Sequence, residues 1–412
     1  MVEMKKYKLG DIADFDKKTL SKKDSMDVIE YLDTGSLTEN IFGPMQVLSR
    51  QDAPSRAQRR VFDKTILYST VRPRLKHYGF MEKPKENVIV STGFVTIDVK
   101  DKFKNVIDPY YLYLLLIQDE ITEYLGTIAD TAVSSYPSLN PSDIQMLEFE
   151  FPDLSIQKKI ASVPYNIDKR IENLRAQNRV LEQTAKTIYD YTFLQCAGHQ
   201  TTYNKTLNRN IPAGWEVKSV GDFAELITKG TTPTTLGFNF EENGVNFVKV
   251  ECIENGRLIT ENLAHISKEA HEKLKRSNLH ENDILVTIAG RLASSCVVPK
   301  SVLPANTNQA VGIIRLTKEN QKYVQYVFYC IFDPAMQNKL KGINAQSIQK
   351  NLTLPNLGNI PIAVPDDKTL EEFNSQVIPI FRKQLVNSQQ IESLTTQRNT
   401  LLPLLMTGKI EV

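Results

Sequence analysis

The sequence has few cysteines, almost no excess charge and no long apolar run. Its four cysteines, Cys196, Cys252, Cys296 and Cys330, do not stand in the paired spacing of a metal or redox motif. Isolated thiols are typical of a reducing compartment, and residues 1–10 lack the apolar core of a secretion signal. No apolar run reaches membrane-spanning length. We therefore expect a cytoplasmic protein with no membrane partner.

Sequence signatures of catalysis and metal binding are also missing. The GK pair at 408–409 does not complete a GxxxxGK phosphate loop, because Pro403 occupies the position of the first glycine. No glycine-rich dinucleotide or methyl-donor turn is found, and no histidine stands in HExxH spacing. We expect no enzyme activity, no cofactor and no metal site in the chain itself.

The balance of charges is nearly even across 412 residues. The formal net charge is +2, with 41% hydrophobic and 24% charged residues. This composition predicts an ordinary globular protein large enough for two or more cores. Bulk charge does not indicate a nucleic-acid binder, so any such function must rest on local basic clusters.

Residues 155–193 carry a heptad repeat. Apolar residues at this spacing keep one narrow stripe along a long helix, and charged residues cover its other faces. A helix of this kind needs a partner helix, which predicts a coiled coil. The two rows of the stripe are Ile160, Ile167, Leu174, Leu181 and Ile188, and Pro164, Ile171, Asn178 and Ala185.

The same two rows recur 213 residues later, near the C-terminus. An isolated heptad helix is most simply a structural brace, but its recurrence after each of two globular segments indicates a functional role. The rows of this second stripe are Phe373, Ile380, Asn387, Leu394 and Leu401, and Val377, Gln384, Ile391 and Arg398.

The segments before the two helices repeat one order of short motifs. LGDIA at 9–13 corresponds to VGDFA at 220–224, and TILYS at 65–69 corresponds to DILVT at 283–287. We predict an α+β protein with two similar mixed α/β domains and an internal repeat. The predicted boundaries are a first domain at 1–153, a long helix at 154–196, a linker at 197–214, a second domain at 215–366 and a second long helix at 367–412.

Several elements of the first domain can be predicted individually. The alternation at 95–99 predicts a half-buried strand, and Asp108 with Pro109 predicts the start of a helix over 110–125. Residues 197–214 are polar and show no periodicity, so we interpret them as a linker.

Local basic clusters stand in loops of both copies. Arg56, Arg59 and Arg60 lie close together, and the turn RPRLKH follows at 72–77. A solvated loop is the simplest alternative for such clusters. Because the loops differ most between the two copies, the repeat suggests one scaffold with two different binding surfaces.

The chain resembles the specificity (S) subunits of type I restriction-modification enzymes along nearly its whole length. The motifs that carry the resemblance occur in the family's order. They are ILYSTVRPR at 66–74, AKTIYDY at 185–191, PAGW at 212–215, VGD at 220–222, GTTP at 230–233 and LLPLLMTGKI at 401–410.

This resemblance implies two target-recognition domains separated by a pair of antiparallel helices, each domain binding one half of a split double-stranded DNA sequence. It also implies that two methyltransferase (M) subunits dock on the helices and adjoining surfaces. Motor-nuclease restriction (R) subunits would join through the methyltransferase core. An antiparallel pair relates the two halves by a pseudo-twofold axis, and pairing Asn178 with Asn387 aligns most of the apolar seam. In that register, Arg398 is expected to send its guanidinium to solvent.

Candidate DNA contacts follow from residue type. Phosphate contacts position a protein, while Arg reads guanine and Asn or Gln reads adenine through paired hydrogen bonds. For each candidate a solvated loop remains the alternative. The phosphate candidates are Arg56, Arg59, Arg60, Lys76 and Lys350, and the base candidates are Arg72, Arg74, Arg291, Asn308, Gln309 and Gln346.

Two other classes of function remain open. A stand-alone sequence-specific DNA-binding protein would need sufficient affinity without partners, which the small net charge disfavours. A coiled-coil assembly scaffold that ignores DNA would leave the basic turn at 72–77 without a purpose.

Overall fold

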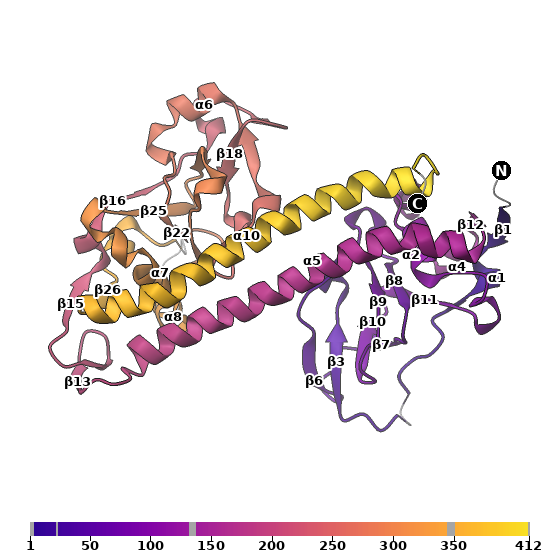
Figure 1. Ribbon diagram of the computed structural model, residues 1–412, viewed down its shortest axis with the longest axis horizontal. Helices are drawn as coiled ribbons and strands as arrows, with labels where there is room; N and C mark the ends of the chain where they lie inside the picture. The colour runs from indigo at the N-terminus through magenta and orange to yellow at the C-terminus, as the bar shows by residue number, and fades with distance from the viewer. Residues whose placement is uncertain (1–3, 22–23, 132–136, 344–350, 411–412) are drawn as a thin grey trace. The chain divides into compact units, whose positions relative to one another are not determined.

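A computed structural model describes residues 4–21, 24–131, 137–343 and 351–410. The chain forms two compact units (Figure 1). Unit 1 comprises residues 1–173 and 393–412, and unit 2 comprises residues 174–392. Each unit contains one mixed domain and a part of both long helices, α5 (Leu154–Tyr189) and α10 (Asp367–Met406).

The central sheet of unit 1 has the order β2-β11-β8-β9. Alternate residues of its strands enter two cores: Ile66 and Ile97 pack with helix α2, whereas Leu67 and Phe94 pack with a second sheet. The prediction of a half-buried strand at 95–99 is therefore wrong, because both faces are covered. The four strands are Ala13–Phe15, Phe94–Val99, Thr65–Ser69 and Tyr78–Met81.

The second sheet of unit 1 has the order β6-β3-β10-β7, and β3 and β10 are parallel. Its strands are Gln46–Ser49, Val28–Leu32, Val88–Ser91 and Ala57–Arg60. Short elements complete the domain: β1 (Lys5–Lys8) paired with β12 (Glu148–Phe151), the hairpin β4 (Leu37–Thr38) and β5 (Ile41–Phe42), and α1 (Leu9–Ile12).

The helical segment of unit 1 begins as predicted but is broken. The Asp108 side chain accepts hydrogen bonds from the amides of Tyr110 and Tyr111 at 3.0 and 2.9 Å and caps α2 (Pro109–Leu116). The single helix predicted over 110–125 is wrong, because a second helix, α3 (Asp119–Asp130), begins after Gln118. Two acidic residues in the first turn of α3 favour a new N-terminus there. Helix α4 (Pro141–Gln145) follows.

Unit 2 repeats this architecture. Its central sheet has the order β16-β25-β22-β23, a second sheet has the order β17-β21-β18-β24, and β18 and β24 are parallel, as β3 and β10 are. Strands β15 and β26 correspond to β1 and β12. The strands of the central sheet are β16 (Ala224–Lys229), β25 (Val311–Leu316), β22 (Ile284–Thr287) and β23 (Ser295–Val297). Those of the second sheet are β17 (Phe240–Glu241), β21 (Ala264–Ile266), β18 (Val245–Val248) and β24 (Ala305–Thr307). The remaining pair is β15 (Glu216–Ser219) and β26 (Pro361–Val364).

Unit 2 also contains a short hairpin and four short helices besides these sheets. A hairpin of β19 (Ile253–Glu254) and β20 (Arg257–Leu258) precedes helix α6. The helices are α6 (Lys268–Lys273), α7 (Val324–Phe332), α8 (Pro334–Ile343) and α9 (Leu354–Gly358).

Residues 197–214, predicted as a linker, instead contain a β-hairpin. Strands β13 (Thr201–Asn204) and β14 (Arg209–Pro212) pair antiparallel. The Asn204 side chain accepts hydrogen bonds from the next turn, and Arg209 Nη1 donates to the Phe193 carbonyl at 2.7 Å. Periodicity missed the hairpin because its strands carry polar residues on both faces.

The long helices contact each other within each unit. In unit 2, Asn387 Nδ2 donates to Asn178 Oδ1 at 2.9 Å, and the rings of Tyr189 and Phe373 lie 6.4 Å apart. Residue 178 of α5 contacts residue 387 of α10, and residue 189 contacts residue 373, so residue numbers decrease along α10 as they increase along α5. The two helix segments therefore run antiparallel in unit 2. Every predicted seam residue is buried or half-buried, and Asn178 and Asn387 are 1% and 0% exposed.

Candidate nucleic-acid interface

Three loops of unit 2 gather at one end of its central sheet. The strand register pairs Thr287 with Val311 and Lys229 with Gly312, which brings the ends of β22 and β16 beside the start of β25. Loops 230–233, 288–294 and 308–310 therefore meet at this end. A surface built from loops on a rigid sheet is a common location for recognition.

Three of the predicted base contacts lie in these loops. The Arg291 side chain is 53% exposed and lies 3.6 Å from Glu254. The Asn308 side chain accepts a hydrogen bond from the Ala310 amide at 3.1 Å, which shapes the loop. Gln309 is exposed, and its Oε1 accepts a hydrogen bond from the Thr232 hydroxyl.

One further polar side chain of this cluster, Arg276, was not predicted from the sequence. Arg276 Nη2 donates to Thr231 Oγ1 at 2.8 Å. Thr231 and Thr232 belong to the GTTP segment, so the motif was visible, but nothing in the sequence placed Arg276 beside it. The segment thus holds a guanidinium and an amide at one site.

Gly230 allows this loop to lie against its neighbour. A Cβ at this position would lie 2.1 Å from the Thr307 carbonyl oxygen and 2.3 Å from that of Asn308. We expect Gly230→Ala to displace the loop and to lower the free energy of unfolding by about 1–3 kcal/mol. Urea unfolding followed by Trp215 fluorescence measures this, because Trp215 is the only tryptophan and lies in unit 2.

Gly342→Ala is the matched control for this prediction. A Cβ at Gly342, in α8, would meet no heavy atom within 4 Å. The same substitution there is expected to leave stability unchanged or to raise it by up to ~1 kcal/mol. Equal effects at the two glycines would contradict the close approach at Gly230.

Unit 1 presents loops at the corresponding end of its own sheet. Ser69 pairs with Phe94, so the loop after β8 and the loop before β11 are adjacent. The Thr70 amide donates to the Gly93 carbonyl at 2.9 Å. The Arg56 carbonyl accepts a hydrogen bond from the Thr92 amide, in the loop before β11, at 2.9 Å. Two exposed predicted contacts, Arg56 and Arg72, lie in these segments.

The other basic residues of the turn at 72–77 bind acidic side chains. Arg74 contacts Glu123 at 2.8 Å and Asp130 at 2.7 Å on α3, and Lys76 contacts Asp119 at 2.7 Å. Hydrogen bonds to these carboxylates raise the pKa of Arg74 and Lys76, so both remain charged. A DNA base at Arg74, or a DNA phosphate at Lys76, would have to replace these carboxylates.

The remaining candidates are less accessible or undescribed. Arg59 and Arg60 lie on β7, where their side chains are 15% and 16% exposed and pair with Asp16 and Asp24. Either arginine would have to leave its ion pair to contact DNA. Gln346 and Lys350 lie outside the described residues.

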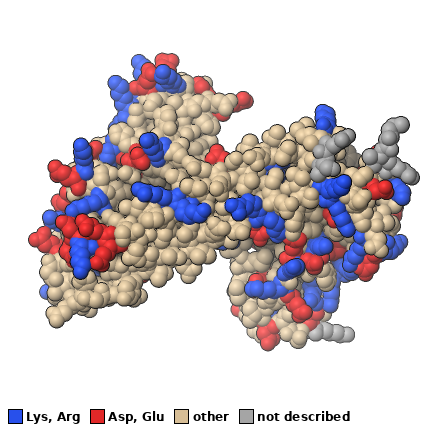
Figure 2. All heavy atoms as spheres, in the orientation of Figure 1, with Lys and Arg blue, Asp and Glu red and all other residues tan. Residues whose placement is uncertain are grey.

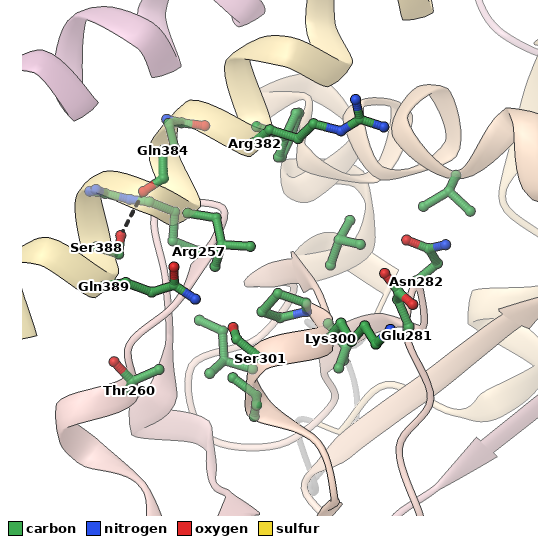
Figure 3. A pocket seen from close by; sticks show the side chains of 18 of the residues that line it. Arg257, Thr260, Glu281, Asn282, Lys300, Ser301, Arg382, Gln384, Ser388 and Gln389 are labelled. Carbon is green, nitrogen blue, oxygen red and sulfur yellow. Dashed lines mark hydrogen bonds between the residues drawn. The ribbon is translucent and has the colours of Figure 1, made fainter.

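A pocket of about 740 Å³ lies within unit 2, between α10 and the domain (Figure 3). Lys300 and Asn282 line it from the domain, and Arg382 and Gln389 line it from α10. The lining carries both signs of charge, because Glu281 and Glu392 line the pocket together with these cationic side chains. No motif in the sequence predicts this pocket, because segments far apart in the chain contribute its lining.

The surface carries mixed charge. Figure 2 shows Lys and Arg interspersed with Asp and Glu on the face in view. Within the described ranges, no group of three or more His, Cys, Asp and Glu side chains is placed to hold a metal ion. Nor does any described helix have the length and apolarity needed to cross a membrane.

Two different loop clusters on two copies of one scaffold are typical of a protein with two recognition surfaces. The family model of the type I restriction modification DNA specificity domain matches residues 1–183 and 212–401. The chain belongs to this family of type I restriction-modification specificity subunits. Its function is DNA sequence recognition within such a system.

Known relatives agree with this assignment. The type I restriction enzyme HindI specificity subunit of Haemophilus influenzae is 24% identical over 472 residues, covering 100% of both chains. The MjaIX specificity subunit of Methanocaldococcus jannaschii is 28% identical over 86% of this chain and 79% of its own. The crystal structure of a type I restriction-modification S subunit from M. genitalium has the same fold, with a TM-score of 0.58 and 16% identity over 98% of this chain and 96% of that one. The predicted family and the two repeated mixed domains are confirmed.

Proposed function

We propose that the chain reads a bipartite, asymmetric DNA site, with one half-site for each recognition domain. The observation that carries this proposal is the pair of loop clusters at corresponding ends of the sheets β2-β11-β8-β9 and β16-β25-β22-β23. Because the two domains share one sheet architecture, we expect both to present their loops to DNA in the same way. Loops of different sequence favour different half-sites.

The residues that would read bases occupy corresponding loops. Arg72 follows β8 and Arg291 follows β22, and both are exposed. A guanidinium in a major groove reads guanine through two hydrogen bonds. Gln309 and Asn308 would add adenine contacts in the second domain, and Arg56 would contact phosphate in the first.

The long helices would set the separation of the half-sites and dock the partner subunits. Helix α5 has 36 residues, and a straight helix of that length spans about 54 Å, more than one turn of DNA at about 34 Å. An antiparallel coiled coil would relate the two domains by a pseudo-twofold axis. In this proposal two M subunits dock on the helices, R subunits join through the methyltransferase core, and the chain itself performs no reaction.

The test replaces one domain in a reconstituted complex. Residues 8–151 are exchanged for the first domain of another specificity subunit, the complex is assembled with its cognate methyltransferase, and N6-methyladenine is mapped across a DNA library. We expect one half-site to change while the other half-site and the spacer length remain, because each domain carries its own loop cluster.

Other outcomes would count against the proposal. Changes in both half-sites would show that the domains do not read DNA independently. Methyl transfer by the isolated chain would contradict a recognition role without catalysis. Tight sequence-specific binding without the methyltransferase, measured across a salt titration, would support a stand-alone DNA-binding protein.

A further inference from the structure

Three side chains from other parts of unit 1 meet at the carboxylate of Asp168, which lies on α5. Arg398 Nη1 of α10 donates to Asp168 Oδ1 at 3.0 Å. The Tyr110 hydroxyl of α2 donates to Asp168 Oδ2 at 2.7 Å, and Asn40 Nδ2 approaches the same oxygen at 3.4 Å. Asp168 and Arg398 are only 13% and 17% exposed. We call Asp168, Arg398, Tyr110 and Asn40 the quartet.

The hydrogen bonds of the quartet hold the elements that they join in one geometry. Burial and the neighbouring Asp168 carboxylate raise the pKa of Tyr110, so its hydroxyl remains protonated and donates. Charge-assisted hydrogen bonds are short and depend on angle, unlike apolar contacts, which tolerate sliding. Breaking a buried pair by removing one partner is also costly, because it leaves a buried charge without compensation. The quartet therefore fixes the geometry of the elements that it joins.

The quartet is linked to the basic turn through one hairpin. Asn40 lies between β4 and β5, and its amide donates to the Tyr78 carbonyl at 2.9 Å. The preceding Glu39 amide donates to the Lys76 carbonyl at 2.9 Å, and the Glu39 carboxylate lies 3.6 Å from Lys76 Nζ. Lys76 belongs to the turn at 72–77, which also contains Arg72.

Close packing leaves little freedom between this hairpin and strand β9. A Cβ at Gly79 would lie 2.9 Å from Leu37 Cδ1 and 2.9 Å from Phe42 Cζ, which are side chains of β4 and β5. The Asn40 Oδ1 atom also accepts a hydrogen bond from the Phe80 amide at 2.8 Å. A shift at Asp168 would therefore be transmitted to the basic turn.

The second copy of the repeat has no equivalent ionic joint at these helix positions. Helices α5 and α10 begin at 154 and 367, an offset of 213 residues, so Asp168 corresponds to Phe381 and Arg398 to Ala185. The Phe381 ring lies 5.8 Å from Phe328, and Ala185 is fully buried in the same apolar core. The ionic joint belongs to the first recognition domain.

We infer that Asp168 is a positioning residue that fixes the basic turn of the first recognition domain against the long helices, and so determines how accurately the first half-site is read. This inference rests on the proposed bipartite function. In this inference Asp168 acts through the hairpin that holds Asn40, without contacting DNA.

The test compares two variants in the reconstituted methyltransferase complex. Asp168→Asn removes the charge and leaves Arg398 buried without a counter-ion, so its melting temperature should fall. The apolar variant Asp168→Leu/Arg398→Met/Tyr110→Phe removes the charges together. It should recover thermal stability, because replacing a whole buried ion pair by apolar side chains is often neutral or stabilising.

The deciding measurement is discrimination at each half-site. In both variants, preference for the correct first half-site over single mismatches should fall about 10- to 100-fold, because small misplacements of a reading group have effects of this size. Preference at the second half-site should remain at the wild-type level. The ratio of the two is measured within the same complexes, so loss of folded protein cancels.

The matched control is a substitution in an exposed ion pair of the same domain. Asp101→Asn breaks an exposed pair with Lys104 at 2.6 Å in the same domain and should change neither half-site. Wild-type discrimination by the apolar variant would overturn the inference and leave the quartet a purely stabilising cluster. A wild-type complex that methylates without a bipartite preference would instead overturn the proposed function.

Discussion

The Asp283→Ala variant should lose about 3–5 kcal/mol of the free energy of unfolding of unit 2, the cost of removing one partner from a buried ion pair. Asp283 is fully buried, and both of its carboxylate oxygens accept hydrogen bonds from Arg315 at 2.7 Å. The carboxylate also accepts a hydrogen bond from the His280 amide at 2.7 Å. Its removal leaves a largely buried guanidinium without a counter-ion.

Urea unfolding followed by Trp215 fluorescence measures this loss. The exposed pair Arg291 and Glu254, separated by 3.6 Å, provides the control. Glu254→Gln should change stability by less than ~1 kcal/mol, because exposed pairs contribute little. An Asp283→Ala variant as stable as Glu254→Gln would show that the Arg315 pair contributes nothing.

The same substitution has a functional consequence. Asp283 immediately precedes β22, whose other end supports the loop that carries Arg291. In the reconstituted complex, recognition of the second half-site should weaken together with the stability of unit 2. Weakening confined to the first half-site would contradict the assignment of these loops.

Local chemistry explains why much of the fold could be predicted from the sequence. Asp108 caps α2 through its own side chain, and the strand at 65–69 is a continuous β-prone segment, so both signals lie within a few residues. The helix break after Gln118 depends on a balance of weak terms, and the β13–β14 hairpin has no apolar alternation. Without an apolar alternation, the sequence of the hairpin cannot be distinguished from that of a loop.

The ion pairs around the candidate site could not be predicted from the sequence. The Arg-rich turn at 72–77 was visible, but the acidic partners of Arg74 stand 49 and 56 residues away, and only the fold brings them together. The same holds for Arg276 beside Thr231. Arg398 was expected to reach solvent, and that expectation is wrong, because its guanidinium pairs with Asp168. Charge pairing across a fold leaves no periodic trace in a sequence.

The paired asparagines of the helix seam form a polar layer within unit 2. Asn387 Nδ2 donates to Asn178 Oδ1 at 2.9 Å, and Gln384 Nε2 donates to the Asn178 carbonyl at 3.2 Å. The Asn387 Oδ1 atom is buried and has no hydrogen-bond partner among the described residues. A buried polar seam residue of this type specifies register at a cost in stability.

Single and double substitutions should therefore have opposite effects on stability. Asn178→Leu alone removes the acceptor that lies 2.9 Å from Asn387 Nδ2, leaves only the longer 3.5 Å contact with Gln177, and should cost about 1–3 kcal/mol. Asn178→Leu with Asn387→Leu removes the unsatisfied acceptor as well and should raise stability above wild type by about 1–3 kcal/mol. Urea unfolding followed by Trp215 fluorescence measures both, because all of these residues lie in unit 2.

The double variant should also relax the spacing between half-sites in the reconstituted complex. An apolar seam permits neighbouring registers that the asparagine pair excludes, so methylation of a library with varied spacers should extend beyond the wild-type length. Val180→Ala with Val386→Ala is the control, because these side chains are 64% and 44% exposed on the same two helices. A double leucine variant that is less stable than wild type, or that keeps a single spacer length, would show that the asparagine pair does not select the register.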